Sequence, residues 1–187
     1  MWRWALAGAV MLTAICGVFV WDTGRLPGGG AARDAGRPSG SDAAVSAAGP
    51  EPPPEARTAL VVRVVDGDTV LLRIGGRGLR VRLIGVDAPE TWARRDCYGA
   101  EAARALRRLV PVGSAVRVIG DREPYDRFGR RLLHLWTSRG RLVSAALVRA
   151  GFARALAIPP DTRYAPLLDA AETAARRSGA GLWRACR

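Results

Sequence analysis

The sequence predicts an α+β fold in which a small closed barrel of five strands is accompanied by about three helices. Two features of residues 58–187 lead to this class: short runs of β-branched residues between glycine-rich turns, and later segments with apolar residues at helical spacing. An apolar run at residues 5–21 and a linker at residues 22–57, rich in Gly, Ala and Pro, precede this part. Because the linker has almost no large apolar residues, we expect it to be a disordered tether.

Five segments have the composition of strands. The turn Asp66-Gly67-Asp68 separates the first segment from the second, and a glycine-rich loop at residues 75–78 separates the second from the third. A loop of this composition between two strand-like runs predicts a hairpin. The predicted strands are residues 60–65, 69–74, 79–86, 115–119 and 131–136.

Three segments have helical signals. Residues 98–110 place apolar side chains on one face and arginines towards another, residues 142–150 end at Gly151, and the last helix begins near Pro166 and ends at Gly179. Five strands interrupted by a helix are typical of a closed barrel of the oligonucleotide-binding (OB) type.

The composition excludes several kinds of site. His134 is the only histidine, which excludes two-histidine catalysis and His-based zinc clusters, and three Cys cannot form a four-cysteine metal site. All 29 basic residues are Arg, and residues 58–187 hold 24 Arg against 12 Asp and Glu. This excess favours a polyanionic partner, either nucleic acid or an anionic membrane. A solvated basic surface in an Arg-rich proteome is the alternative.

The apolar run at residues 5–21 has no charge and follows Arg3. Its length is at the short limit for a membrane-spanning helix and slightly beyond that of the apolar region within a usual signal peptide. We therefore expect a signal anchor or a cleaved signal peptide, with a buried core helix as a third reading. In the first two cases the remainder of the chain lies outside the cytoplasm, either anchored by a single membrane pass or secreted.

Three carboxylates are candidates for a metal site. Asp68 opens the second strand and Asp87 ends the third, so the hairpin places them about 7–8 Å apart at one end of the sheet. Pro89 turns the chain and brings Glu90 near them. Oxygen ligands without His or Cys favour Ca²⁺ or Mg²⁺ over zinc or copper. The alternative is that these residues form only a turn and a helix cap.

Two arginines are candidates for binding a phosphate. Arg82 lies on the third strand and Arg130 begins the fifth. Guanidinium groups bind phosphate through paired hydrogen bonds and would stabilise the charge of a five-coordinate phosphorus. Five residues of straight strand span about 16 Å, so the chain must curve to bring Arg82 to Asp87.

Four motifs in this order and spacing resemble the staphylococcal nuclease family over residues 59 to about 184. They are Val65-Asp66-Gly67-Asp68-Thr69-Val70, Arg82-Leu83-Ile84-Gly85-Val86-Asp87-Ala88-Pro89-Glu90-Thr91, Tyr98-Gly99-Ala100-Glu101-Ala102 and Asp126-Arg127-Phe128-Gly129-Arg130. The resemblance implies an OB barrel and Ca²⁺-dependent hydrolysis of DNA and RNA.

The resemblance also implies a role for each site residue. Asp68, Asp87 and the Ala88 carbonyl are metal ligands, Glu90 is the general base, Arg82 and Arg130 bind the scissile phosphate, and Arg127 and Phe128 contact substrate. The family's type member has Thr, Lys and Tyr in place of Ala88, Arg127 and Phe128, and a pair of Tyr that this chain lacks within residues 153–160. Some relatives have lost the acidic residues, so a non-catalytic nucleic-acid-binding module on the cell surface is the alternative function.

The cysteines predict one disulfide. Cys16 lies in the apolar run, which leaves Cys97 and Cys186 as the possible pair within the exported part. A reactive thiol or two unpaired thiols are the alternatives.

Overall fold

The structure is a computed structural model of the chain, and it describes residues 49–91 and 96–186. The predicted apolar segment at residues 5–21 and most of the predicted linker lie outside the described residues. No helix in the described ranges is both long and apolar enough to cross a bilayer.

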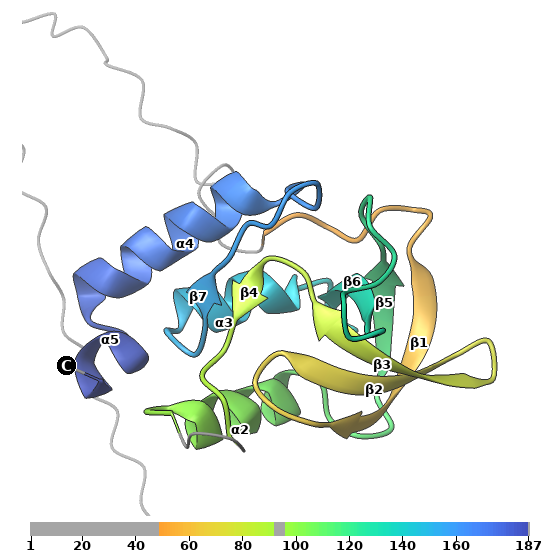
Figure 1. The fold of residues 1–187 in the computed structure, drawn as a ribbon, viewed down its shortest axis with the longest axis horizontal. Coiled ribbons are helices and arrows are strands. Elements are labelled where there is room, and N and C mark those ends of the chain that lie inside the picture. The colour runs from red at the N-terminus through yellow and green to blue at the C-terminus, as the bar shows by residue number, and fades with distance from the viewer. Residues whose placement is uncertain (1–48, 92–95, 187) are drawn as a thin grey trace, which may run out of the picture. The chain divides into compact units, whose positions relative to one another are not determined.

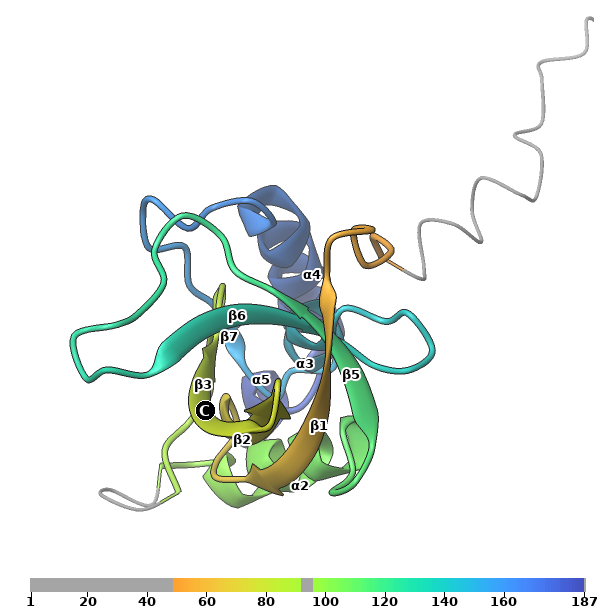
Figure 2. The ribbon, with the colours of Figure 1, turned by 90° about the vertical axis from the view of Figure 1, so that its right-hand side faces the viewer.

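The predicted five-stranded barrel is confirmed. Its strands close in the order β1-β2-β3-β6-β5, with β3 and β6 parallel and the other pairs antiparallel (Figure 1, Figure 2). Val70, Leu72 and Val81 are fully buried because alternate residues of each strand face the barrel interior. The strands are β1 (Arg57–Val64), β2 (Thr69–Ile74), β3 (Arg77–Leu83), β5 (Ala115–Ile119) and β6 (Arg131–Trp136).

The hairpin and the third strand differ from the prediction. The turn consists of Gly75 and Gly76 alone, both with positive φ, so β3 begins at Arg77 rather than after a four-residue loop. The predicted strand at residues 79–86 ends at Leu83, because Gly85 adopts a φ of 84° and the chain bends there. Beyond the bend, β4 (Val86–Asp87) pairs with β7 (Arg154–Ala155) in a separate two-stranded sheet.

Four helices occur in the described residues, where the sequence predicted about three. Buried Ala and Leu side chains of α2, including Leu106, join the barrel core, and α3 packs against α2, α4 and β6. Leu147 of α3 and Leu168 of α4 belong to the same core. The helices are α2 (Gly99–Leu109), α3 (Val143–Arg149), α4 (Ala165–Ser178) and α5 (Leu182–Ala185).

The folded part extends N-terminal to the predicted boundary at residue 58. The indole N–H of Trp136, a fully buried residue, donates to the carbonyl of Pro50 at 2.7 Å. Ala56 is buried, and its carbonyl accepts from Nε of Arg117 at 2.9 Å. The end of the predicted linker is therefore held on the barrel, since it supplies hydrogen-bond acceptors that the barrel side chains need.

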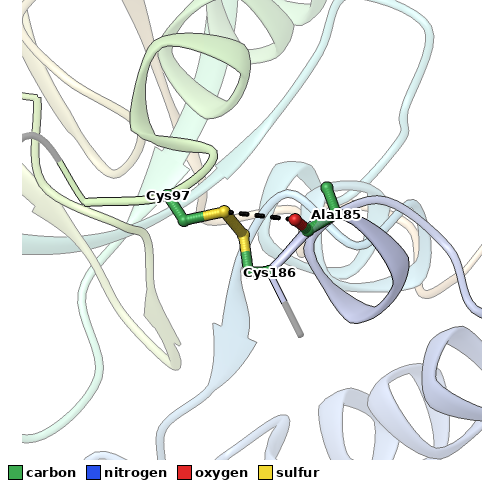
Figure 3. Close-up of a disulfide and its surroundings, with 3 residues drawn as sticks. All are labelled: Cys97, Ala185 and Cys186. Carbon is green, nitrogen blue, oxygen red and sulfur yellow. Dashed lines mark hydrogen bonds between the residues drawn. A yellow bond between two sulfur atoms is a disulfide. The ribbon is translucent and has the colours of Figure 1, made fainter.

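Cys97 and Cys186 are joined in the structure, with 5.7 Å between their Cα atoms (Figure 3). Cys97 precedes α2 and Cys186 follows α5, so the bond connects the first described helix to the end of the last. The pairing links positions 89 residues apart in the sequence.

Candidate active site

The bend at Gly85 brings Asp87 back towards the end of β3. Nη2 of Arg82 lies 3.3 Å from Oδ1 of Asp87, and the same guanidinium pairs with Oδ2 of Asp68. The register places Asp68 opposite Leu83, whose N–H donates to the Asp68 carbonyl at 2.9 Å. One arginine thus joins the two carboxylates, and the bend closes the gap that a straight strand would leave.

Asp68 is buried among hydrogen-bond donors. Its Oδ1 accepts from the Thr69 hydroxyl and its Oδ2 from the Ala88 N–H, both at 3.0 Å, while its own N–H donates to Oδ1 of Asp66. Burial raises the pKa of Asp68 to about 7; Arg82 opposes this rise and Asp66 adds to it. The cost of burying the ionised carboxylate is therefore larger than the stabilisation that Arg82 gives it.

Gly67 allows the Asp68 turn to approach the loop after β4. A Cβ at this position would lie 2.6 Å from Cβ of Ala88 and 2.8 Å from Cβ of Ala102. Because such contacts are too short for any side chain, only glycine lets the turn pack against Ala88 and α2. This packing brings the Asp68 carboxylate to the Ala88 N–H.

Asp126 holds the second arginine in place. Its Oδ1 accepts from the main-chain N–H groups of Phe128 and Arg130, both at 2.9 Å, and its Oδ2 pairs with Nε of Arg130 at 2.6 Å. Burial opposes ionisation, but these donors outweigh it and lower the pKa of Asp126. Nη1 of Arg130 lies 3.4 Å from Oγ1 of Thr69, which connects Arg130 to Asp68 through one hydroxyl.

A cleft of about 520 Å³ opens beside these residues. Arg82 and Arg130 line it from the barrel, and residues 156 and 158–161 line the facing side. Phe128 lines the cleft with two thirds of its surface exposed, and the guanidinium carbons of Arg127 and Arg130 lie 4.8 and 5.4 Å from its ring centroid. The cleft thus presents cationic groups and an exposed ring to a ligand.

Glu90 lies close in sequence to this cluster but outside its bonded network. Its N–H donates to Oδ2 of Asp96 at 3.3 Å, and its carbonyl packs against Gly99 at the start of α2. Its side chain is exposed and forms no ion pair or hydrogen bond with any other described residue. The structure therefore brings together Asp68, Asp87, Ala88, Arg82 and Arg130, with Arg127 and Phe128 at the cleft. The Glu90 carboxylate has no partner within residues 49–91 and 96–186.

The donor set fits a hard divalent cation. Asp68 and Asp87 contribute two carboxylates that share one guanidinium, and carboxylate oxygens are the ligands that such a cation prefers. Across the residues that the structure describes there is no group of three or more His, Cys, Asp or Glu that could hold a metal. A cation at this site would therefore depend on main-chain oxygen, water or substrate for its remaining ligands.

Three residues that support the site were missed by sequence reasoning. Asp66 accepts from the Asp68 N–H, Thr69 connects Asp68 with Arg130, and Asp126 fixes Arg130. The role of Asp126 could have been predicted from the sequence. Asp side chains in turns often accept from main-chain N–H groups a few residues later, as Asp126 does from Phe128 and Arg130. The role of Thr69 could not have been predicted from the sequence, since Arg130, which it connects with Asp68, lies 61 residues away in the chain.

Comparison with known proteins identifies the family to which the chain is related. Residues 80–185 match the family described as staphylococcal nuclease homologue. The chain is similar to the thermonuclease of Staphylococcus intermedius, with 36% identity over 127 residues that cover 66% of this chain and 74% of the relative. The corresponding values for the thermonuclease of Staphylococcus hyicus are 32% over 130 residues, 68% and 76%.

A protein called an uncharacterized endonuclease, from Escherichia coli O157:H7, is 33% identical over 123 residues, which cover 66% of this chain and 74% of that protein. The family match covers more than half of the chain and contains Arg82, Asp87 and Arg130. The chain belongs to the staphylococcal nuclease family.

Proposed function

We propose that this chain is a calcium-dependent nuclease that hydrolyses phosphodiester bonds of DNA and RNA outside the cytoplasm. The observation that carries the proposal is the convergence of two carboxylates and two guanidinium groups, where Arg82 pairs with both Asp68 and Asp87 and Arg130 reaches Thr69. Membership of the family supports a nuclease, and the names of the relatives support nucleic acid as the substrate.

Arg82 and Arg130 would bind the scissile phosphate. Both line the cleft, and each guanidinium has five N–H donors, so the pairs with Asp68, Asp87 and Asp126 leave donors for phosphate oxygens. Because these pairs fix the guanidinium groups before substrate arrives, little reorganisation is needed as charge develops on the phosphate.

Asp68, Asp87 and the Ala88 carbonyl would hold the calcium ion. The chemistry that a bound calcium ion supplies there is Lewis-acid stabilisation of negative charge on the phosphate. The Thr69 hydroxyl positions the Asp68 carboxylate, and Asp66 holds the main chain at Asp68 by accepting from its N–H.

Glu90 would accept the proton of the attacking water. Its carboxylate is exposed and has no partner among the described residues, so it is available to a water molecule at the phosphate. Arg127 and Phe128 would contact the substrate next to the scissile phosphate, because both line the cleft.

The location outside the cytoplasm rests on the apolar run at residues 5–21 alone. A signal anchor would keep the enzyme at the membrane, and cleavage after this run would release it.

Digestion of plasmid DNA and of RNA, with Ca²⁺ and with excess chelator, tests the proposal. We expect cleavage in Ca²⁺ and none in chelator. Binding of nucleic acid without cleavage in Ca²⁺ would instead support the non-catalytic binding module.

A further inference from the structure

The outer face of the barrel is basic without compensating acids. None of the five barrel strands contains an Asp or Glu, whereas β1, β2 and β3 together contain six Arg. In most solvated faces charges of both signs are interspersed, which limits the field that any one face produces. This face has one sign only, so it attracts polyanions.

The strand register places three of these arginines on one face of the sheet. Arg63 pairs across β1 and β2 with Leu71, which pairs across β2 and β3 with Arg80, so these residues form one row across three strands. Arg73 lies two residues along β2 from Leu71 and therefore on the same face. We call Arg63, Arg73 and Arg80 the sheet arginines.

The sheet arginines are exposed and have no partner among the residues that the structure describes. None of the three forms an ion pair, hydrogen bond or ring contact with another residue in the described parts of the chain. By contrast, Arg82 and Arg130 are held by acidic side chains. An exposed guanidinium without a partner keeps all its donors available for a ligand.

The row leads into the cleft. Arg80 and Arg82 are two residues apart on β3, with inward-facing Val81 between them, so they lie on one face about 7 Å apart along the strand. A polymer bound at Arg82 through one phosphate therefore reaches Arg80 with a neighbouring phosphate. A surface that binds lipid headgroups does not need to adjoin the cleft. Because the sheet arginines do adjoin it, the arrangement favours a nucleic-acid strand over a membrane surface.

We propose that the sheet arginines form an extended binding surface for the sugar-phosphate backbone of a nucleic-acid strand whose scissile phosphate lies at Arg82 and Arg130. The inference rests on the proposed function for the identity of the polymer. Because these contacts lie away from the scissile bond and involve phosphates only, they add affinity without sequence preference.

The test measures binding apart from cleavage. The full chain is titrated with a fluorescently labelled 30-nucleotide single strand in excess EDTA, at several salt concentrations, and the anisotropy gives Kd. The variant Arg63→Gln/Arg73→Gln/Arg80→Gln is compared with a control of equal charge, Arg107→Gln/Arg108→Gln/Arg149→Gln. The control residues are exposed arginines on α2 and α3 that also lack a protein partner in the described structure.

We expect the variant of the sheet arginines to raise Kd at low salt on the order of tenfold more than the control does. The slope of log K against log salt should fall in magnitude by about 2. The variant loses three phosphate contacts, and each contact on a single strand contributes about 0.7 to the slope. Equal losses in both variants would overturn the proposal, because net charge alone would then explain them. If the triple variant does not fold, Arg80→Gln against Arg107→Gln gives the same comparison.

A second arm separates the two polyanions. Binding to phosphatidylglycerol vesicles is compared between the same two variants. Both variants contain the apolar run at residues 5–21, so any vesicle binding by this run is the same in both. Loss of vesicle binding with an unchanged Kd for the strand would assign the surface to lipid and overturn the proposal. Failure of the wild type to cleave DNA in Ca²⁺ would contradict the proposed function but would leave these Kd values unaffected.

Discussion

Arg82 is held between two carboxylates and is only 13% exposed in its side chain. A charge that is partly removed from water interacts more strongly with a phosphate than an exposed one, because solvent screens it less. Arg130 has a similar environment, since Asp126 and Thr69 contact it from two sides. In the proposed function, both arginines are thus held in position before charge develops in the transition state.

At the residue scale we predict that Glu90→Gln and Arg130→Ala each lower kcat on the order of 10²-fold or more, because their interactions strengthen in the transition state. Arg139→Ala removes an exposed arginine without a partner in the described structure and should leave kcat unchanged. Initial rates on an oligonucleotide in saturating Ca²⁺ measure the effect. A wild-type rate for Glu90→Gln would remove the general-base assignment.

His134 makes stability depend on pH. It is buried against the rings of Trp136 and Tyr164, and neither ring nitrogen has a hydrogen-bond partner among the described residues. Burial is the main cause that lowers the pKa of His134 from 6.5 to about 4; Asp121 and Asp161 oppose this shift, and Arg163 contributes to it. The folded protein therefore favours the neutral ring.

We predict that the contribution of His134 to the free energy of unfolding falls as pH drops from about 6.5 towards 4, because the unfolded chain binds a proton that folded His134 excludes. The loss reaches on the order of 3 kcal/mol at the lower limit. Urea unfolding of wild type and of His134→Phe, which keeps an aromatic ring, measures the difference between the two proteins at each pH. Parallel pH profiles for the two proteins would contradict the assignment.

At the scale of elements, the turn before β2 must pack against the loop after β4. We predict that Gly67→Ala destabilises the protein by about 1–3 kcal/mol and lowers the cleavage rate, since the new Cβ would overlap Ala88 and Ala102. Gly78→Ala is the control, because a Cβ there meets nothing within 4 Å. Unfolding midpoints and rates are compared; equal values for both variants would show that the turn is not tightly packed.

The strands were predictable where their signals are local. β2, β5 and β6 have the predicted bounds because β-branched runs and turn glycines mark them. The division of the predicted third strand into β3 and β4 was not predictable, since β4 pairs with β7, about 70 residues later in the chain, and the Gly85 carbonyl accepts from Leu156 N–H. Tertiary pairing, not local propensity, ends β3.

The candidate site was predictable in its residues but not in its geometry. The motifs pointed to Asp68, Asp87 and Arg82, and the structure brings these three together. Their actual contact depends on the bend at Gly85 and on the missing side chain of Gly67. Both are consequences of long-range packing that a single sequence does not display.

At the scale of the whole molecule, the Cys97–Cys186 bond connects the N-terminal end of α2 to the chain end after α5. We predict that protein exported through an oxidising route contains this disulfide, and that Cys97→Ser/Cys186→Ser lowers the free energy of unfolding by about 4 kcal/mol, as expected for closing a loop of this length. Non-reducing mass mapping and urea unfolding measure the two effects. A free thiol at Cys97 in the exported protein would contradict the prediction.

The account depends most on the claim that the Asp68 cluster cleaves phosphodiester bonds with calcium. The direct measurement is the rate of oligonucleotide cleavage by wild type, by Asp68→Asn and by Asp169→Asn, which changes an exposed carboxylate on α4 without a partner in the described structure. We predict that wild type and Asp169→Asn cleave at equal rates in Ca²⁺ and stop in excess chelator, while Asp68→Asn is slower on the order of 10²-fold or more. Wild-type cleavage that persists in chelator, or an undiminished rate for Asp68→Asn, would contradict the account.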